Sequence, residues 1–213
     1  MSVTSEITGA RTAIIRQAFW LEYLTLAWMT IEAVVAVGSG IAADSLVLTA
    51  FGVDSVIELG SAGVLIWRLA IELRHGGAFG EYAERAGSKI AGALLLALAI
   101  YVVAMAAWKL WMQQGAEFSL PGLVLSTLSI PIMYVLSRRK LALAERLGSR
   151  ALRADAVESI TCGWLAFVVV ATLLVQLVFN AWWLDAVASL GIVWFLIREG
   201  REAWLGEACC DHC

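Results

Sequence analysis

The chain has 213 residues, of which 61% are hydrophobic and only 15% are charged, and its formal net charge is −3. A soluble domain carries about 25% charged residues, so this composition indicates an integral membrane protein in contact with lipid. The weakly acidic balance argues against nucleic acid as a partner, because such binding needs a broad basic surface. The N-terminal stretch MSVTSEITGARTAIIRQ is polar, so we expect no cleavable signal peptide.

Six apolar stretches are long enough to cross a membrane, which takes about 20 mostly apolar residues in a helix. The third and fourth carry no internal charge, whereas the other four contain isolated acids. Because a helix satisfies its own backbone hydrogen bonds in lipid, we predict an all-α membrane protein, a bundle of six transmembrane helices. In chain order the predicted spans are about residues 17–38, 46–72, 90–108, 118–137, 154–178 and 182–198.

The basic residues predict the orientation of these spans. Of the 15 Lys and Arg residues, only Lys109 adjoins one of the connections 38–44, 113–118 and 179–183, and the others lie at the opposite ends of the spans. Because cytoplasmic loops are enriched in Lys and Arg, we predict a multi-pass protein of the cell membrane with both termini in the cytoplasm. The predicted parts are a cytoplasmic N-terminal segment (1–16), a transmembrane domain (17–203) and a short cytoplasmic tail (204–213).

Two connecting segments lie on the basic side. Residues 72–89 mix charges with glycines, and we predict a short amphipathic or interfacial piece after the second span. Residues 138–150 read RRKLALAERLGSR. This segment has helical character, and we interpret it as a cytoplasmic anchor of the topology.

Acidic residues and a cysteine recur at the same spacing inside two of the spans. GVDSVIEL contains Asp54 and Glu58, and AVESITCG contains Glu158 and Cys162. Residues four apart lie on one face of a helix, so each pair points in one direction. If the second and fifth spans pack together, the four side chains can form the ligand shell of a metal ion.

The energetic cost of a charge in a membrane favours a functional reading of these pairs. A charge at the bilayer centre costs about 2.5–3.5 kcal/mol on insertion scales, so such residues are expected to face the protein interior or a water-filled cavity. A four-ligand shell suits Zn²⁺, but the thiol favours softer ions and the carboxylates favour harder ones. The identity of the metal is therefore not fixed by these residues. The competing interpretation makes Cys162 a small buried apolar residue. It makes Asp54, Glu58 and Glu158 partners in interhelical hydrogen bonds, or acids that face the lumen without binding a ligand.

Three further acids are weaker candidates. Glu32 in the first span either lines the pathway or forms hydrogen bonds between helices. Asp155 lies one turn before Glu158, either on the pathway or in a salt bridge to Arg153 or another arginine of the connecting loop. Asp185 begins the sixth span, where the helix dipole favours an acid.

The chain closes with GEACCDHC, a tail of soft metal donors. Cys209, Cys210, His212 and Cys213 fall within five residues, and Cys210 and Cys213 form a CxxC pair. Thiolates and imidazoles bind Zn²⁺ and softer ions well, so the tail is a candidate second metal site that captures or senses metal. Redox chemistry at the CxxC pair and a tail without a role remain alternatives.

The second, fifth and sixth spans carry sequence motifs that resemble those of the cation diffusion facilitator family. The resemblance extends along nearly the whole predicted membrane domain. The resemblance is carried by the second span, by RADAVESITC (153–162) and by DAVASL (185–190). It implies six transmembrane helices with cytoplasmic termini and a metal site of paired i, i+4 ligands on helices 2 and 5. By position, Asp54 and Glu58 match the helix 2 ligands, and Glu158 and Cys162 match those of helix 5.

This chain departs from the family pattern in ways that leave the metal open. Glu58 stands where the family has Asp, Glu158 where it has His or Asp, and Cys162 where it has Asp. The resemblance is to the transmembrane domain only, without the usual cytoplasmic C-terminal domain that helps dimerisation, so a homodimer is left open. The His-rich loop of some zinc-transporting members is also missing.

From the residues and the resemblance together we predict a divalent metal cation transporter that exports its ion in exchange for protons. It is not predicted to be an enzyme, since no phosphate-binding GxxxxGK[ST] loop is present. Zn²⁺ is the first candidate ion, followed by Cd²⁺, Co²⁺, Mn²⁺ and Hg²⁺, with no permanently bound cofactor. Two other classes are compatible with the sequence: a membrane metal sensor without transport, and a membrane thiol oxidoreductase that uses Cys210 and Cys213.

Overall fold

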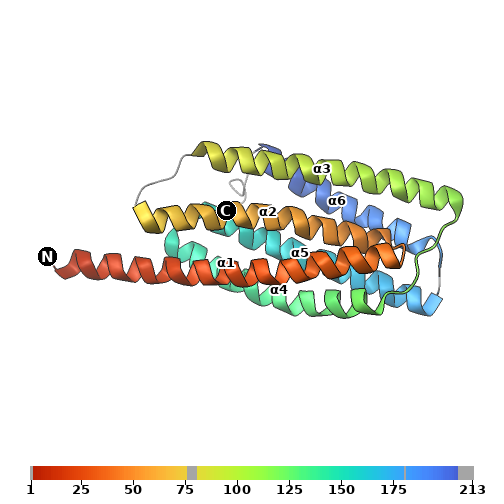
Figure 1. Ribbon diagram of the computed structural model, residues 1–213, viewed down its shortest axis with the longest axis horizontal. Helices are drawn as coiled ribbons and strands as arrows, with labels where there is room; N and C mark the ends of the chain where they lie inside the picture. The colour runs from red at the N-terminus through yellow and green to blue at the C-terminus, as the bar shows by residue number, and fades with distance from the viewer. Residues whose placement is uncertain (1, 76–80, 180, 206–213) are drawn as a thin grey trace.

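The protein is a bundle of long helices in the computed structural model, which describes residues 2–75, 81–179 and 181–205 (Figure 1). Within these residues the chain is all-helical, which confirms the predicted fold class of six helices. In chain order they are α1 (Ser2–Ala42), α2 (Leu46–His75), α3 (Glu81–Met112), α4 (Leu120–Leu147), α5 (Arg150–Phe179) and α6 (Leu184–Leu205).

Five of the described helices are long and apolar enough to cross a membrane. α6 carries Asp185 at its start and four charges within 198–202, which shorten its uncharged apolar run. Large apolar side chains cover the outside of the bundle: Ile100 is 72% exposed and Val178 is 73% exposed. Extended apolar surface of this kind is typical of contact with a membrane. The chain is therefore a multi-pass membrane protein.

α2 lies at the centre of the packing. It contacts α1, α3, α5 and α6, while α4 packs mainly against α5 and also contacts α1. α3 packs mainly against α6, and the two run side by side along one edge of the bundle in Figure 1. A side chain that points inward from the middle of α2 therefore meets residues of α5 and α6.

Glycines allow two of the helix pairs to approach closely. A Cβ atom on Gly52 of α2 would lie 2.7 Å from the backbone nitrogen of Val37 in α1. A Cβ atom on Gly92 of α3 would lie 2.7 Å from the backbone oxygen of Gly200 in α6. Since real Cβ atoms do not come so near to backbone atoms, these contacts require glycine and hold α6 close to α3.

The helix ends carry polar caps. Ser119 begins α4, and its hydroxyl accepts a hydrogen bond from the backbone N–H of Gly122 at 3.2 Å. Gly148 ends α4 in a left-handed conformation (φ 62°) that favours glycine. Ser149 follows directly and accepts a hydrogen bond from the backbone N–H of Leu152 at 3.3 Å, so α5 begins at once. This connection is too short to be a flexible loop.

The described parts of the two connecting segments on the basic side belong mainly to the long helices. Residues 72–75 end α2 and residues 81–89 begin α3, so the described parts of 72–89 continue the long helices and do not form a separate interfacial piece. Residues 138–147 are the last turns of α4, which confirms their helical character.

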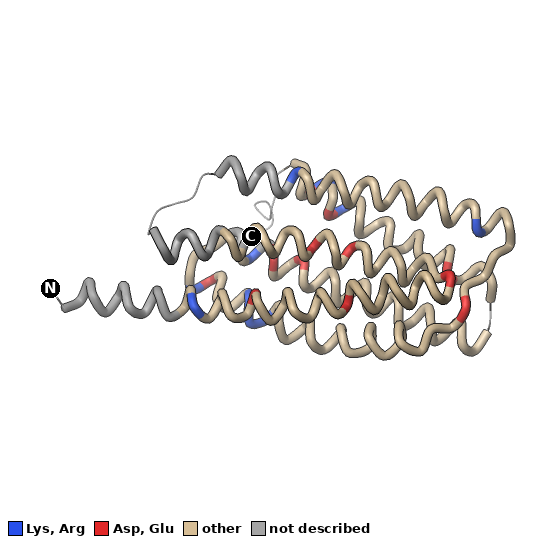
Figure 2. Tube along the Cα trace, in the orientation of Figure 1, with Lys and Arg blue, Asp and Glu red and all other residues tan. Residues whose placement is uncertain are grey.

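Figure 2 shows that the Lys and Arg residues of the described chain concentrate toward the end of the bundle where α4 meets α5. At the opposite end Lys109 contacts Asp44, with its Nζ atom 2.8 Å from Oδ1. This distribution matches the charge asymmetry of the sequence, and the orientation of the termini stays a prediction.

Candidate cation site

The acidic pair of α2 points into the bundle, as its spacing predicts. Asp54 is 0% exposed and Glu58, one turn later, is 7% exposed. Neither oxygen of Asp54 has a hydrogen-bond partner, and Oε1 of Glu58 has none either. A buried polar atom without a partner loses its interaction with water and gains nothing in return. These three oxygens are therefore open to a ligand that carries positive charge.

Glu199 of α6 joins this pair. One carboxylate oxygen from each of Asp54, Glu58 and Glu199 can be chosen so that all three lie within 4.8 Å of one another. Within the described part of the chain, no Lys or Arg forms an ion pair with any of the three. Sequence reasoning missed Glu199 because it lies between Arg198 and Arg201, where the charges read as the polar end of a span.

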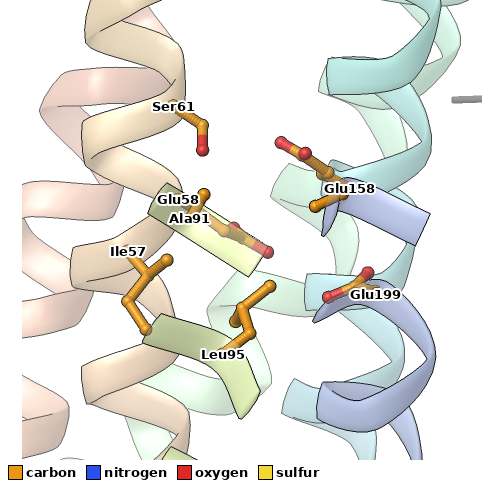
Figure 3. Close-up of a pocket in the computed structure, with 8 residues that line it drawn as sticks. Ile57, Glu58, Ser61, Ala91, Leu95, Glu158 and Glu199 are labelled. Atoms are coloured by element: carbon orange, nitrogen blue, oxygen red, sulfur yellow. The ribbon is translucent and has the colours of Figure 1, made fainter. Parts of the chain in front are cut away.

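A small cavity lies beside these carboxylates, with a volume of about 20 Å³. A water molecule needs about 10–15 Å³ measured in this way, so the cavity has room for one water or one ion. Figure 3 shows the carboxylates of Glu58, Glu158 and Glu199 pointing toward this common space from α2, α5 and α6. Ser61 adds a hydroxyl, and Ile57 and Leu95 add apolar walls. Glu158 thus shares a cavity with Glu58 and Glu199.

Cys162, the fourth residue of the predicted shell, is engaged elsewhere. It is 0% exposed, and its thiol donates a hydrogen bond to Oε1 of Glu32 at 3.2 Å. Among the described residues, Cys162 is not one of those that line the cavity beside Glu58. Two residues on the same face of a helix can meet different neighbours, because each turn of α5 lies at a different level of the bundle.

Glu32 is the centre of a hydrogen-bond network between helices, one of the two roles that its sequence allows. It is fully buried, and both of its carboxylate oxygens accept hydrogen bonds. The donors come from four helices. They are Trp28 Nε1 of α1 (3.1 Å), the Ser55 hydroxyl of α2 (2.8 Å), the Ser129 hydroxyl of α4 and the Cys162 thiol of α5.

Lys140, within residues 138–150, lies inside the bundle, and the cytoplasmic anchoring of this segment stays a prediction. This residue is 0% exposed, donates hydrogen bonds to Asp155 and to the hydroxyl of Ser159, and lies 3.3 Å from Oε2 of Glu22. The ammonium therefore joins α1, α4 and α5. Asp155 forms the expected salt bridge, and among the described ion pairs its partner is this lysine. Continuation of α4 to Leu147 carries Lys140 inside the bundle.

Two other sequence predictions concern the ends of the chain and of α6. Asp185, expected at the N-terminus of its own helix, caps α2 as well: it accepts hydrogen bonds from the Ser45 hydroxyl at 2.6 Å and from the backbone N–H of Leu46 at 2.7 Å. The soft donors of the tail, Cys209, Cys210, His212 and Cys213, lie outside the described residues.

The chemistry of the site is that of a cation receptor. Several carboxylates face one small space from three helices, and the acids that lie deepest have no hydrogen-bond donor. When the site holds no cation, ionised carboxylates there repel one another and are kept from water, which costs free energy. Binding of a divalent cation or of protons removes that cost. The arrangement holds no nucleophile with an adjacent base, so among the described residues it suits binding and release better than bond cleavage.

Comparisons with known proteins agree with this chemistry. The model of the cation efflux transmembrane domain matches residues 23–204, which include α2 to α5, the C-terminal part of α1 from residue 23 and all of α6 except its last residue. A search of curated proteins found no match. The family match confirms the resemblance to the cation diffusion facilitators, and metal ions are the substrates that this family implies. The chain belongs to the cation efflux family, whose members are membrane transporters and not enzymes.

Proposed function

We propose that this protein carries a divalent metal cation across the membrane in exchange for protons. The single observation that supports this most is Asp54, whose two oxygens are buried without a hydrogen-bond partner beside Glu58. Family membership supports cation transport, and the acid-lined cavity supplies a binding place for the ion. Zn²⁺ and other divalent transition-metal ions are the substrates that we propose.

In this proposal the cation binds between α2 and α5. Asp54 and Glu58 provide oxygens from α2, and Glu158 provides them from α5 across the cavity. Carboxylates bind a divalent metal only when they are deprotonated. The same oxygens therefore hold either the metal or protons, and occupation by one displaces the other.

Proton coupling follows from access to this one site from alternate sides of the membrane. The ion enters from the cytoplasm and displaces protons, and opening to the other side lets protons return and release the ion. We propose that the basic end of the bundle faces the cytoplasm, because 14 of the 15 basic residues lie on that side and only Lys109 on the other. The direction of export follows from this orientation and from the direction of the proton gradient.

The test is metal binding and flux by Asp54→Asn and Glu158→Gln in comparison with the wild type. Both changes keep the shape of the side chain and remove a charge, so the bundle is expected to fold. We expect each to lower Zn²⁺ flux into proteoliposomes at least tenfold. Glu117→Gln is the matched control, because Glu117 is an exposed acid in the connection between α3 and α4, and it should transport like the wild type. Full transport by Asp54→Asn would rule out the proposed site.

A further inference from the structure

Glu199 has no role in a site formed by α2 and α5 alone, yet it faces the same carboxylates. We propose that Glu199 is a direct ligand of the transported cation, which is then bound between α2 and α6 by carboxylate oxygens. We propose further that this oxygen set selects a hard divalent cation of the Mn²⁺ class over thiophilic ions such as Cd²⁺. The inference rests on the proposed function, because it concerns the same ion.

The spacing of the oxygens fits one coordination sphere. Hard divalent cations hold oxygen ligands at about 2.0–2.6 Å, so two ligands on opposite sides of one ion are about 4–5 Å apart. The selected oxygens of Asp54, Glu58 and Glu199 all lie within 4.8 Å of one another. One ion can therefore contact all three after small adjustments of the side chains.

Asp54 differs from the buried acids outside this group in the described chain, because each of those has a hydrogen-bond donor or a cation beside it. Glu32 accepts four hydrogen bonds, Glu22 and Asp155 share Lys140, and Asp185 caps α2. Asp54 is equally buried, but both of its oxygens lack a donor, and it is aimed at Glu58 and Glu199. A buried carboxylate in such surroundings is stable only with a proton or a cation beside it.

The packing of α6 explains how a residue near its charged end reaches the site. Gly200 lies next to Glu199, and a Cβ atom there would come within 3.0 Å of Leu96 and 3.1 Å of the Gly92 backbone oxygen in α3. Small residues at this crossing bring the α6 backbone inward. Glu202, three residues later, instead forms a surface ion pair with Arg198 at 3.0 Å. Of these two neighbouring acids, only Glu199 lines the cavity.

The chemistry of the ligand set indicates the class of ion. The carboxylates of Asp54, Glu58 and Glu199 provide oxygens only, and Glu158 adds a further carboxylate at the cavity wall. The Cys162 thiol is bound to Glu32 and so lies outside this set. Carboxylate and water ligands suit Mn²⁺ and similar hard ions, whereas thiolates are what favour soft ions.

The experiment measures Mn²⁺ binding directly, so its readout does not depend on transport. The full-length protein is reconstituted in lipid nanodiscs and titrated with Mn²⁺, and free Mn²⁺ is followed by its electron paramagnetic resonance signal. We expect Glu199→Gln to weaken binding at least tenfold. The matched control Glu202→Gln removes an acid from the same helix outside the cavity, and it should stay within twofold of the wild type. Cys162→Ser should also stay within threefold, and Cd²⁺ should compete no better than Mn²⁺ itself.

The outcomes separate this inference from the proposed function. If Asp54→Asn loses Mn²⁺ binding and Glu199→Gln binds like the wild type, the α6 ligand is wrong and the α2 site stands. If the wild type binds neither Mn²⁺ nor Zn²⁺, both proposals fail. Preferential Cd²⁺ binding that Cys162→Ser abolishes would overturn the oxygen-only site. Glu199→Asp serves as a second variant, because it keeps the charge and should bind Mn²⁺ more tightly than Glu199→Gln.

Discussion

Removal of the Lys140 ammonium is expected to destabilise the bundle strongly. The ammonium lies 3.3 Å from Oε2 of Glu22, is hydrogen-bonded to Asp155, and is fully buried. At that separation, with an effective dielectric constant of about 20, one unit-charge pair attracts by about 5 kcal/mol. Loss of one partner from a buried ion pair typically costs about 3–5 kcal/mol, because the remaining charge is left uncompensated. We therefore expect Lys140→Met to lower the free energy of unfolding by about 3–5 kcal/mol.

The assay is equilibrium unfolding in mixed micelles, followed by circular dichroism, with Arg139→Met as the control. Arg139 is the preceding residue, carries the same charge and is exposed, so its replacement should change the free energy by no more than about 0.5 kcal/mol. Combining Lys140→Met with Glu22→Gln and Asp155→Asn should restore much of the lost stability, because no charge is then left unpaired. A change below about 1 kcal/mol for Lys140→Met alone would refute the buried ion-pair argument.

Three further results are expected. Asp185→Ala leaves the Ser45 hydroxyl and two backbone N–H groups of α2 without their acceptor. Thermal unfolding should therefore show that the free energy of unfolding falls by about 2 kcal/mol or more. Asp185→Asn should lower it less, and equal stability of the wild type and the alanine variant would contradict the capping role. Gly92→Ala places a Cβ atom 2.7 Å from the Gly200 oxygen and should destabilise by about 1–3 kcal/mol, whereas Gly63→Ala, with nothing within 4 Å of its Cβ position, should not. Zn²⁺ affinity, measured by calorimetry, should fall as the pH is lowered, because protons compete for the same carboxylates; an affinity independent of pH would argue against proton exchange.

The parts of the site that were predictable from sequence are those that depend on local geometry. Asp54 and Glu58 share a face because they lie one helical turn apart, and burial follows from their place within an apolar span. The number of helices follows in the same way, from the length of each apolar run. Neither inference requires knowledge of which helices are neighbours.

The parts that were missed depend on how the helices pack. Glu199 enters the cavity because close contact at Gly92 and Gly200 brings α6 inward, and its own surroundings in the sequence are charged. Lys140 lies in a segment with many charges, and its burial depends on Glu22 of α1 and Asp155 of α5. Cys162 has the expected spacing from Glu158, but its level in the bundle is occupied by Glu32. In each case the partner lies on another helix, far away in sequence.

The central claim is that the buried carboxylates carry a metal cation in exchange for protons, and flux into proteoliposomes tests it most directly. Wild-type protein and Asp54→Asn would be compared for uptake of Zn²⁺, Mn²⁺, Co²⁺, Cd²⁺ and Hg²⁺, with and without an imposed pH gradient. We predict uptake of at least one ion that speeds up when the vesicle interior is acidic, stops when a protonophore collapses the gradient, and is lost in Asp54→Asn. Uptake that is equal in the variant, or absent for every ion in the wild type, would contradict the account.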